Sequence, residues 1–192
     1  SSNPLTALYF ACTSEDKKDN NGEVIILSIV KDDINYFDSD KVSCIANLVK
    51  LKYQQKNKLF ELIQSDKEAI LSDNEFDTNV DYYQLIHFIR QEKPYFQPTI
   101  KASDLSSILC VKGRLNQDRI IAQAGSFLLY GLESTLSKEG NDSIKVDKIT
   151  IKKEDKQYLL DELDILGINE RTIYPSIENS SKYIKRRLEL GI

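Results

Sequence analysis

The chain has 192 residues, 41% of them hydrophobic, which suits one folded domain with an apolar core. Its 26 basic and 30 acidic residues give a formal net charge of -4, so the composition disfavours nucleic-acid phosphates and anionic lipid as partners. No apolar run reaches the roughly 18 residues of a membrane span, and no signal-peptide pattern occurs. We therefore expect no membrane association and a cytoplasmic location.

The first elements expected are a helix and a strand. Residues 3–12 are almost entirely apolar and open with a polar cap and Pro4 at the first helical position, which predicts a buried helix. A charged loop follows and ends in Asn20-Asn21-Gly22, a turn signal. The run Val24-Ile25-Ile26-Leu27 is β-branched and apolar without alternation, which predicts a central strand over residues 23–30 that is covered on both faces, one of them by a helix.

A helical insertion is expected at about residues 40–92. Its first helix carries Val42, Ile45, Ala46 and Val49 at helical spacing behind an aspartate cap at Asp40. Three further helices are expected around Leu59–Ile63, at Ile70–Leu71, and over about 80–91 behind a cap at Asp77 or Asn79.

Residues that often carry catalysis or bind metals are few. His87, the only histidine, lies inside the last of these helices with no nucleophile or carboxylate motif beside it, and it receives no role. Cys12, Cys44 and Cys110 are odd in number and widely spaced, which predicts three buried reduced thiols. The acidic stretch 31–40 lacks the spacing of a calcium loop. We expect no metal site and no intrinsic cofactor.

Strands and helices then follow one another toward the C-terminus. Short apolar runs predict strands at 107–111 and 126–130, the second of them buried, and alternation predicts a strand with one wet face over 144–151. Together with the elements before them, these predict an α+β fold in which helices pack around a small mixed β-sheet.

The last part of the chain, about residues 153–190, is expected to be helical. One amphipathic helix runs over 152–166, with Gly167 as its C-terminal cap. Ser176 caps the final helix, whose basic run 185–187 is interpreted as a solvated face rather than a nucleic-acid patch. The apolar stripes of the two helices are expected to be Tyr158, Leu159, Leu163 and Leu166, and Ile177, Tyr183, Ile184 and Leu188.

The candidate site lies in the stretch from Gln117 to Gly131. A helical turn would bring Arg119 and Gln123 onto one face, because the two residues are four apart. Gly125 then breaks the turn before the strand at 126–130. The polar groups of Arg119 and Gln123 are therefore expected near the start of that strand. Catalysis would need more than this stretch holds, since its one acid is Asp118 and it has no histidine or cysteine.

Three separated motifs, taken together, resemble the FRG domain, a bacterial and phage module found in abortive-infection and other proteins. They span nearly the whole chain in the order that the family shows. The first motif is Asn3-Pro4-Leu5-Thr6-Ala7-Leu8-Tyr9-Phe10-Ala11, followed by Gly22-Glu23-Val24. The second motif is Arg119-Ile120-x-x-Gln123-x-Gly125-x-Phe127. The third motif is Leu163-x-x-x-Gly167-Ile168-Asn169-Glu170-x-Thr172-Ile173-Tyr174-Pro175.

The sequence departs from the family at its start. The Phe-Arg-Gly motif that names the family and the Pro-Thr-Arg-Leu-Leu-Asp-Trp segment that precedes the Asn-Pro helix do not occur in it. With the absence of methionine, this predicts that residues 1–192 are the C-terminal part of a single FRG-like domain. The missing N-terminal segment would then be a partner of this chain.

The layout that the resemblance implies is similar to that of mono-ADP-ribosyltransferases, so a relation to that fold is expected. Arg119 and Gln123 would be the catalytic candidates, and Ser2, Asn3, Gln123 and Ser126 the ligand-binding candidates, with NAD as substrate. Gln123 stands where those enzymes have a glutamate. Its amide can hydrogen-bond a ribose hydroxyl, but it has no charge with which to stabilise a cation, which lowers the expectation of transferase chemistry.

Three interpretations of the site remain open. The complete domain could bind NAD or a related nucleotide and transfer or hydrolyse its ADP-ribose. It could instead be a non-catalytic module of antiphage defence that binds a nucleotide or a protein partner in the same cleft. In the third interpretation Arg119 and Gln123 only satisfy backbone groups at a helix end and fix the turn before the strand.

Overall fold

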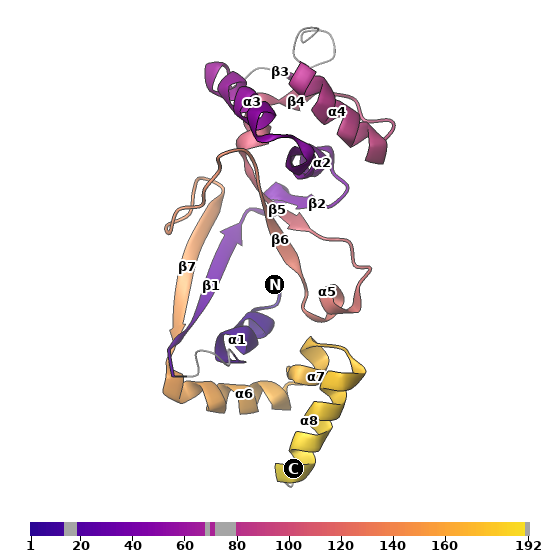
Figure 1. The fold of residues 1–192 in the computed structure, drawn as a ribbon. Coiled ribbons are helices and arrows are strands. Elements are labelled where there is room, and N and C mark those ends of the chain that lie inside the picture. Colours follow the sequence, from indigo (N-terminus) through magenta and orange to yellow (C-terminus); the bar gives the residue numbers. More distant parts are fainter. Residues whose placement is uncertain (14–18, 68–69, 72–79, 191–192) are drawn as a thin grey trace. The chain divides into compact units, whose positions relative to one another are not determined.

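The computed structural model describes residues 1–13, 19–67, 70–71 and 80–190 (Figure 1). It has a mixed α+β fold with small sheets and helices, which confirms the predicted fold class. The chain divides into two compact units, each built from segments that are separated in the sequence. Unit 1 comprises Ser1–Ser28, Gly113–Ser126 and Ile144–Ile192, and unit 2 comprises Ile29–Lys112 and Phe127–Ser143. That residues 1–192 belong to one FRG-like domain stays a prediction.

Unit 1 holds the N-terminal helix, most of a long strand pair, and the C-terminal helices. A 3-10 turn at Lys153–Asp155 leads into the first of these C-terminal helices. The elements are α1 (Pro4–Thr13), β1 (Gly22–Ile29, whose last residue belongs to unit 2), α5 (Asp118–Ala122), β7 (Ile144–Ile151), α6 (Lys156–Ile165), α7 (Glu170–Ile173) and α8 (Ile177–Leu190).

Unit 2 holds the remaining strands and the helices of the middle of the chain. Three 3-10 turns, at Lys31–Asp33, Leu48–Lys50 and Ala102–Ser106, link its elements. These are β2 (Ile34–Tyr36), α2 (Asp40–Asn47), α3 (Tyr53–Ser65), β3 (Ile70–Leu71), α4 (Val80–Glu92), β4 (Ile100–Lys101), β5 (Ile108–Lys112) and β6 (Ser126–Tyr130, whose first residue belongs to unit 1).

In unit 1, α1 packs on α6 around a small apolar cluster. The Asn3 side chain caps α1 by accepting from the Leu5 amide at 3.0 Å, and Pro4 follows at the first helical position, as the sequence predicted. The helix is less buried than expected, because Leu5 and Phe10 are exposed. The buried residues of the cluster are Tyr9, Leu163 and Ile173.

β1 and β7 form a two-stranded sheet of their own (Figure 1). The prediction that the first strand is covered on both faces is wrong, since Ile25 is 54% exposed and Ile26 is also exposed. A continuous apolar run normally marks a strand inside a parallel sheet. Within the described ranges β1 pairs with β7 alone, and side chains on both of its faces are exposed.

The sheets of unit 2 are short. β2, β5 and β6 form a three-stranded sheet in which β2 runs parallel to β5, with Ile34 opposite Cys110. β3 pairs antiparallel with β4, so the helix expected at Ile70–Leu71 is wrong. At the end of β6, Gly131 is required because a Cβ there would collide with the Leu105 carbonyl oxygen.

Helices α2, α3 and α4 pack together in unit 2 around a large apolar core. The cap of α2 is Ser39, whose hydroxyl accepts from the Val42 amide, and not Asp40, which is the first helical residue. Candidate caps Asp77 and Asn79 of α4 lie outside the described residues. The largest fully buried hydrophobic side chains of this core are Leu59, Ile63, Tyr82, Leu85, Ile86, Ile89 and Leu105.

Glycine ends α6 as predicted. Gly167 has a φ of 78°, its amide donates to Asp164, and the Ile168 amide donates to Leu163, which is the Schellman pattern. The apolar stripe predicted for this helix is partly wrong, because Tyr158 and Leu166 are exposed. Leu160 and Leu163 make the packed face instead.

The cysteines are reduced, and two of the three are buried. Cys12 and Cys44 are buried, whereas Cys110 is half-buried. Burial raises the pKa of Cys44 to about 12 and also raises the pKa of Cys12 and Cys110. In the part of the chain that the structure describes, no helix is long and apolar enough to cross a membrane.

Candidate functional site

The end of α5 adopts an uncommon backbone conformation. The Ala124 amide donates to Ile121 and the Gly125 amide to Ile120, as in a Schellman motif, but the left-handed position is filled by Ala124 with a φ of 46°. The sequence predicted that Gly125 would break this turn. A Cβ at position 125 would lie 3.1 Å from the Ile120 side chain, so a larger residue there would require that side chain to shift. A non-glycine residue in this region is strained by roughly 1–3 kcal/mol.

The N-terminal residues are bonded to this strained turn. The Ser2 amide donates to the Ala124 carbonyl at 2.8 Å, and the Ser2 hydroxyl reaches the same oxygen at 3.2 Å. The Ser1 hydroxyl donates to the Gln123 carbonyl at 2.7 Å. The two residues that precede the first motif are therefore in direct contact with the second motif within unit 1.

The Gln123 side chain links the turn at the end of α5 to the third motif. Its Nε2 donates to the Ile173 carbonyl oxygen at 3.2 Å, at the end of α7. The side chain is half-buried, and its Oε1 accepts no hydrogen bond from any residue in the described ranges. One end of the amide thus supports the fold, while the other end remains able to accept a hydrogen bond.

Arg119 lies one helical turn from Gln123 and is exposed. Its guanidinium carbon lies over the Tyr174 ring, 5.4 Å from the ring centre, which is a cation–π contact. The Phe10 ring meets the same tyrosine edge-on at 6.0 Å. Among the residues that the structure describes, no carboxylate pairs with Arg119.

The other two candidate residues have smaller roles in this arrangement. Asn3 is the cap of α1, and its backbone N–H donates to the Ser1 hydroxyl at 3.0 Å. Ser126 is half-buried at the start of β6, and its hydroxyl makes no hydrogen bond with the described part of the chain. We call Ser2, Arg119, Gln123 and Tyr174 the Arg119 cluster.

The Arg119 cluster has groups that suit a ligand carrying an anionic group next to a hydroxyl. A guanidinium presents several N–H donors in a planar fork that matches a phosphate, and the Gln123 Oε1 can accept from a hydroxyl. It lacks a charged base, since no described carboxylate contacts Arg119 or Gln123. Recognition is the chemistry that these residues support.

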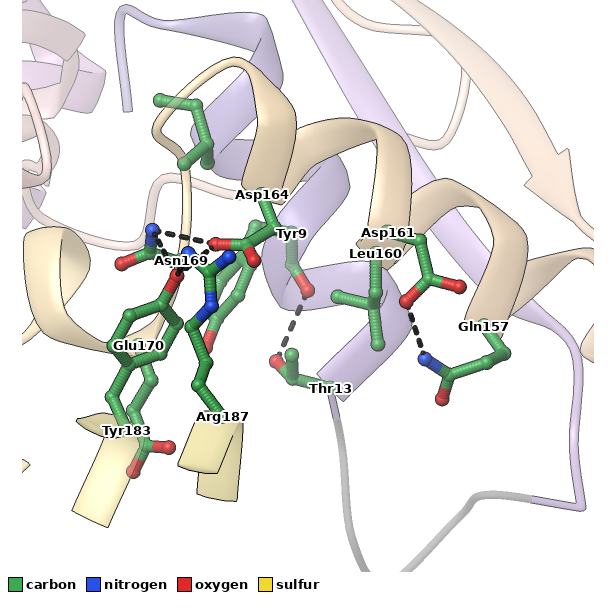
Figure 2. Close-up of a pocket in the computed structure, with 11 residues that line it drawn as sticks. Tyr9, Thr13, Gln157, Leu160, Asp161, Asp164, Asn169, Glu170, Tyr183 and Arg187 are labelled. Atoms are coloured by element: carbon green, nitrogen blue, oxygen red, sulfur yellow. Dashed lines mark hydrogen bonds between the residues drawn. The ribbon is translucent and has the colours of Figure 1, made fainter. Parts of the chain in front are cut away.

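A cavity of about 140 Å³ lies elsewhere in unit 1, between α1, α6, the turn into α7, and α8 (Figure 2). Its apolar wall includes Leu160 and Ile168, and its polar wall combines three carboxylates with one guanidinium. None of the predicted site residues lines it. The lining residues are Tyr9, Thr13, Gln157, Leu160, Asp161, Asp164, Ile168, Asn169, Glu170, Tyr183 and Arg187.

A hydrogen-bonded group fixes one side of this cavity. Asp164 Oδ1 accepts from the Tyr183 hydroxyl at 2.6 Å and from Asn169 Nδ2 at 2.7 Å (Figure 2). Burial, followed by the bond to Asp164, raises the pKa of Tyr183. Arg171 and Arg187 each lie 5.9 Å from the Tyr183 ring. Asn169 also caps α7, so the group joins α6, α7 and α8.

No family model, curated protein or solved structure matches this chain. The resemblance to the FRG domain therefore stays a prediction that rests on the three sequence motifs. The described residues contain no group of three or more histidines, cysteines and acidic residues that could hold a metal ion.

Sequence reasoning missed the residues that complete both places. Ile173 and Tyr174 belong to the third motif, but nothing in the sequence indicates that Tyr174 contacts Arg119 or that the Ile173 carbonyl accepts from Gln123. Tyr183 was expected on an apolar face, yet its hydroxyl belongs to the cavity wall. The i, i+4 spacing of Arg119 and Gln123 was the one local signal that located the cluster.

Proposed function

We propose that this chain is an FRG-like module that binds a nucleotide, or another phosphate ester of a sugar, at the Arg119 cluster without catalysing a reaction on it. The observation that carries the proposal is the exposed Arg119 guanidinium, lying over Tyr174 and paired with no described carboxylate. An arginine whose charge is not neutralised within the fold is available to an external anion.

The contact with Tyr174 prepares Arg119 for this role. The guanidinium lies over the aromatic ring, and its planar fork of N–H donors can bind two phosphate oxygens together. The contact also restricts a long side chain that would otherwise lose rotamer freedom on binding. Tyr174 is in turn held edge-on by Phe10.

Gln123 supports recognition of the sugar. Its Nε2 is used by the Ile173 carbonyl, which fixes the amide plane and leaves Oε1 to accept from a ribose hydroxyl. A residue fixed in this way and without charge cannot stabilise the oxocarbenium-like cation of ADP-ribosyl transfer. This favours a binding module over a transferase.

The biological setting follows from the resemblance alone. FRG-like chains of this kind would act in antiphage defence in the cytoplasm, with a protein partner or an N-terminal segment of the same domain supplying the opposite wall of the nucleotide cleft. The exposed face of β1, including Ile25, is one place in unit 1 where such a segment could pack.

Calorimetric titration with ADP-ribose tests the proposal. We expect measurable binding by the unmodified chain, a loss of at least about tenfold in affinity for Arg119→Ala, and a smaller loss for Arg119→Lys, which keeps the charge without the planar fork. Arg114→Ala removes the same charge from the same unit outside the cluster and should change the affinity less than about twofold. Equal affinity of the Arg119→Ala and unmodified chains would overturn the proposal.

A second assay separates binding from chemistry. The chain is incubated with nicotinamide-labelled NAD, and free nicotinamide is measured for the unmodified chain and for Gln123→Ala. We expect NAD to stay intact with both. Release of nicotinamide that disappears in Gln123→Ala would show an enzyme and contradict the non-catalytic part of the proposal, while leaving the binding part standing.

A further inference from the structure

The last helix presents its apolar residues to solvent. Ile177, Ile184 and Leu188 of α8 are 89%, 49% and 75% exposed. An amphipathic helix normally turns its apolar stripe toward its own core. Successive residues of a helix are about 100° apart, so these three lie on one side of α8 and form an exposed stripe of apolar side chains.

The opposite side of α8 is the one that packs on unit 1, and it is polar. Asn179 Nδ2 reaches the Tyr174 carbonyl at 3.4 Å, and the Tyr183 hydroxyl donates to Asp164. Arg187 reaches the Tyr183 hydroxyl at 3.3 Å. The helix is therefore held to its own unit by polar contacts, and its apolar stripe remains available for a partner.

The spacing of the stripe is that of a helix pair. Residues 177, 181, 184 and 188 are separated by four, three and four positions, which are the d, a, d and a positions of a heptad. Three of these positions are Ile, Ile and Leu, and the small Ser181 fills the fourth. A stripe of this kind fits along one other helix.

Charges beside the stripe select the orientation of that helix. Glu178 and Lys185 occupy the two e positions on one flank of the stripe. In an antiparallel pair of identical helices, each Glu178 lies beside Lys185 of the second copy, so two ion pairs form. In a parallel pair the partners of the e positions are g positions, and Lys185 would face the uncharged Ser180.

Existing ion pairs on α8 extend this pattern. Glu178 already pairs with Lys182 at 2.7 Å, and Lys185 lies 3.9 Å from Glu189. Across an antiparallel contact, Lys182 and Glu178 of one copy would lie in a row with Lys185 and Glu189 of the second copy. The four charges in this row would alternate in sign. Such a network favours the antiparallel register and disfavours a slipped one.

We propose that α8 pairs with α8 of a second copy of this chain in an antiparallel, two-fold symmetric contact. Ile177 packs against Leu188 of the second copy, and Ser181 packs against Ile184 of the second copy. The contact is isologous, so it closes as a dimer. Because the stripe is short, the dimer is weak and its population depends on protein concentration. The proposal is independent of nucleotide binding at the Arg119 cluster.

Sedimentation velocity over a range of concentrations tests the dimer. We expect the unmodified chain to move from monomer to dimer as its concentration rises, and Ile184→Lys to remain a monomer. Ile165→Lys is the matched control, because Ile165 is an exposed isoleucine on α6 of the same unit. It should dimerise like the unmodified chain. A monomer at every concentration, or equal loss in both variants, would overturn the proposal.

A charge exchange tests the orientation. Glu178→Lys and Lys185→Glu each replace two attractive pairs by two repulsive ones and should raise the dimer dissociation constant by about tenfold. The double variant restores opposite charges across the contact and should recover most of the affinity. Failure of the double variant to recover rules out the antiparallel pair. Binding of a monomer to vesicles of phosphatidylcholine and phosphatidylglycerol would assign the stripe to a membrane surface and also contradict the proposal.

Discussion

The two units of the molecule are stabilised in different ways. Unit 2 surrounds one large apolar core to which α2, α3, α4 and strand β5 contribute buried side chains. The apolar cluster of unit 1 has only Tyr9, Leu163 and Ile173 as its buried residues. Ring contacts, cation–π contacts and hydrogen bonds add to it, such as the bonds of Ser2 and Gln123 to main-chain oxygens.

This difference matters for function. Regions with few buried apolar contacts open at lower free energy than a well-packed core, and binding elements are drawn from such regions. Unit 1 carries the Arg119 cluster, the cavity, and the exposed stripe of α8, whereas unit 2 holds the large apolar core. Unit 2 thus supplies stability, and unit 1 supplies surfaces for ligands and partners.

The largest effect is expected from a matched pair of core truncations. Leu59 of unit 2 and Leu163 of unit 1 are 0% and 2% exposed. Leu59→Ala should lower the free energy of unfolding by roughly 4 kcal/mol and Leu163→Ala by roughly 2 kcal/mol, since the smaller cluster can collapse around the lost atoms. Urea unfolding measures both. An equal or larger loss for Leu163→Ala would contradict the comparison.

Thiol labelling compares the opening of the two units. Cys12 of unit 1 and Cys44 of unit 2 are both buried, and burial raises the pKa of each, so labelling requires local opening. In variants that keep one of these thiols and replace the other and Cys110 by serine, Cys12 should react at least about tenfold faster. Equal rates would show that the units open together.

Relief of backbone strain should stabilise unit 1. Ala124→Gly removes the strain of a φ of 46° and should raise the free energy of unfolding by about 0.5–1 kcal/mol. Ala122→Gly, in the last helical position of α5, is the control and should lower it by about the same amount. If Ala124→Gly destabilises the chain instead, the turn is not strained.

The smallest effect concerns alkaline pH. The raised pKa of Tyr183 means that the fold favours the neutral phenol, so its contribution is complete below the unfolded pKa of about 10 and is lost as pH rises through the folded pKa. Tyr183→Phe should reduce the loss of stability between about pH 9 and 11. Tyr158→Phe, at an exposed position, should leave it unchanged. Identical profiles for the two variants would contradict a raised pKa of Tyr183 in the folded state.

Local signals predicted much of the secondary structure. The cap at Asn3, the glycine at 167 and the cap at Ser176 located helix ends, because each acts through neighbouring backbone groups. The pairing of Ile70–Leu71 with Ile100–Lys101 joins distant residues through main-chain bonds and leaves no periodic pattern in so short a strand. The sequence therefore predicts a helix where the structure has a strand.

Burial and the completed site could not be predicted in the same way. The apolar residues of β1 and α8 indicate that these elements pack against another surface. They do not indicate whether that surface belongs to the same unit or to another molecule. Arg119 and Gln123 were found from their spacing on one helical face. Tyr174 reaches them through packing between α5 and α7, which only the tertiary structure shows.

The most direct test of the account maps the ligand onto the chain. Amide chemical shifts of the ¹⁵N-labelled protein are followed by NMR during titration with ADP-ribose. The account predicts saturable shifts confined to unit 1, at Ser2, Arg119, Gln123 and Tyr174, while the amides of Ile45, Leu85 and Ile100 in the core of unit 2 stay unchanged. An absence of shifts, or shifts centred on unit 2, would contradict it.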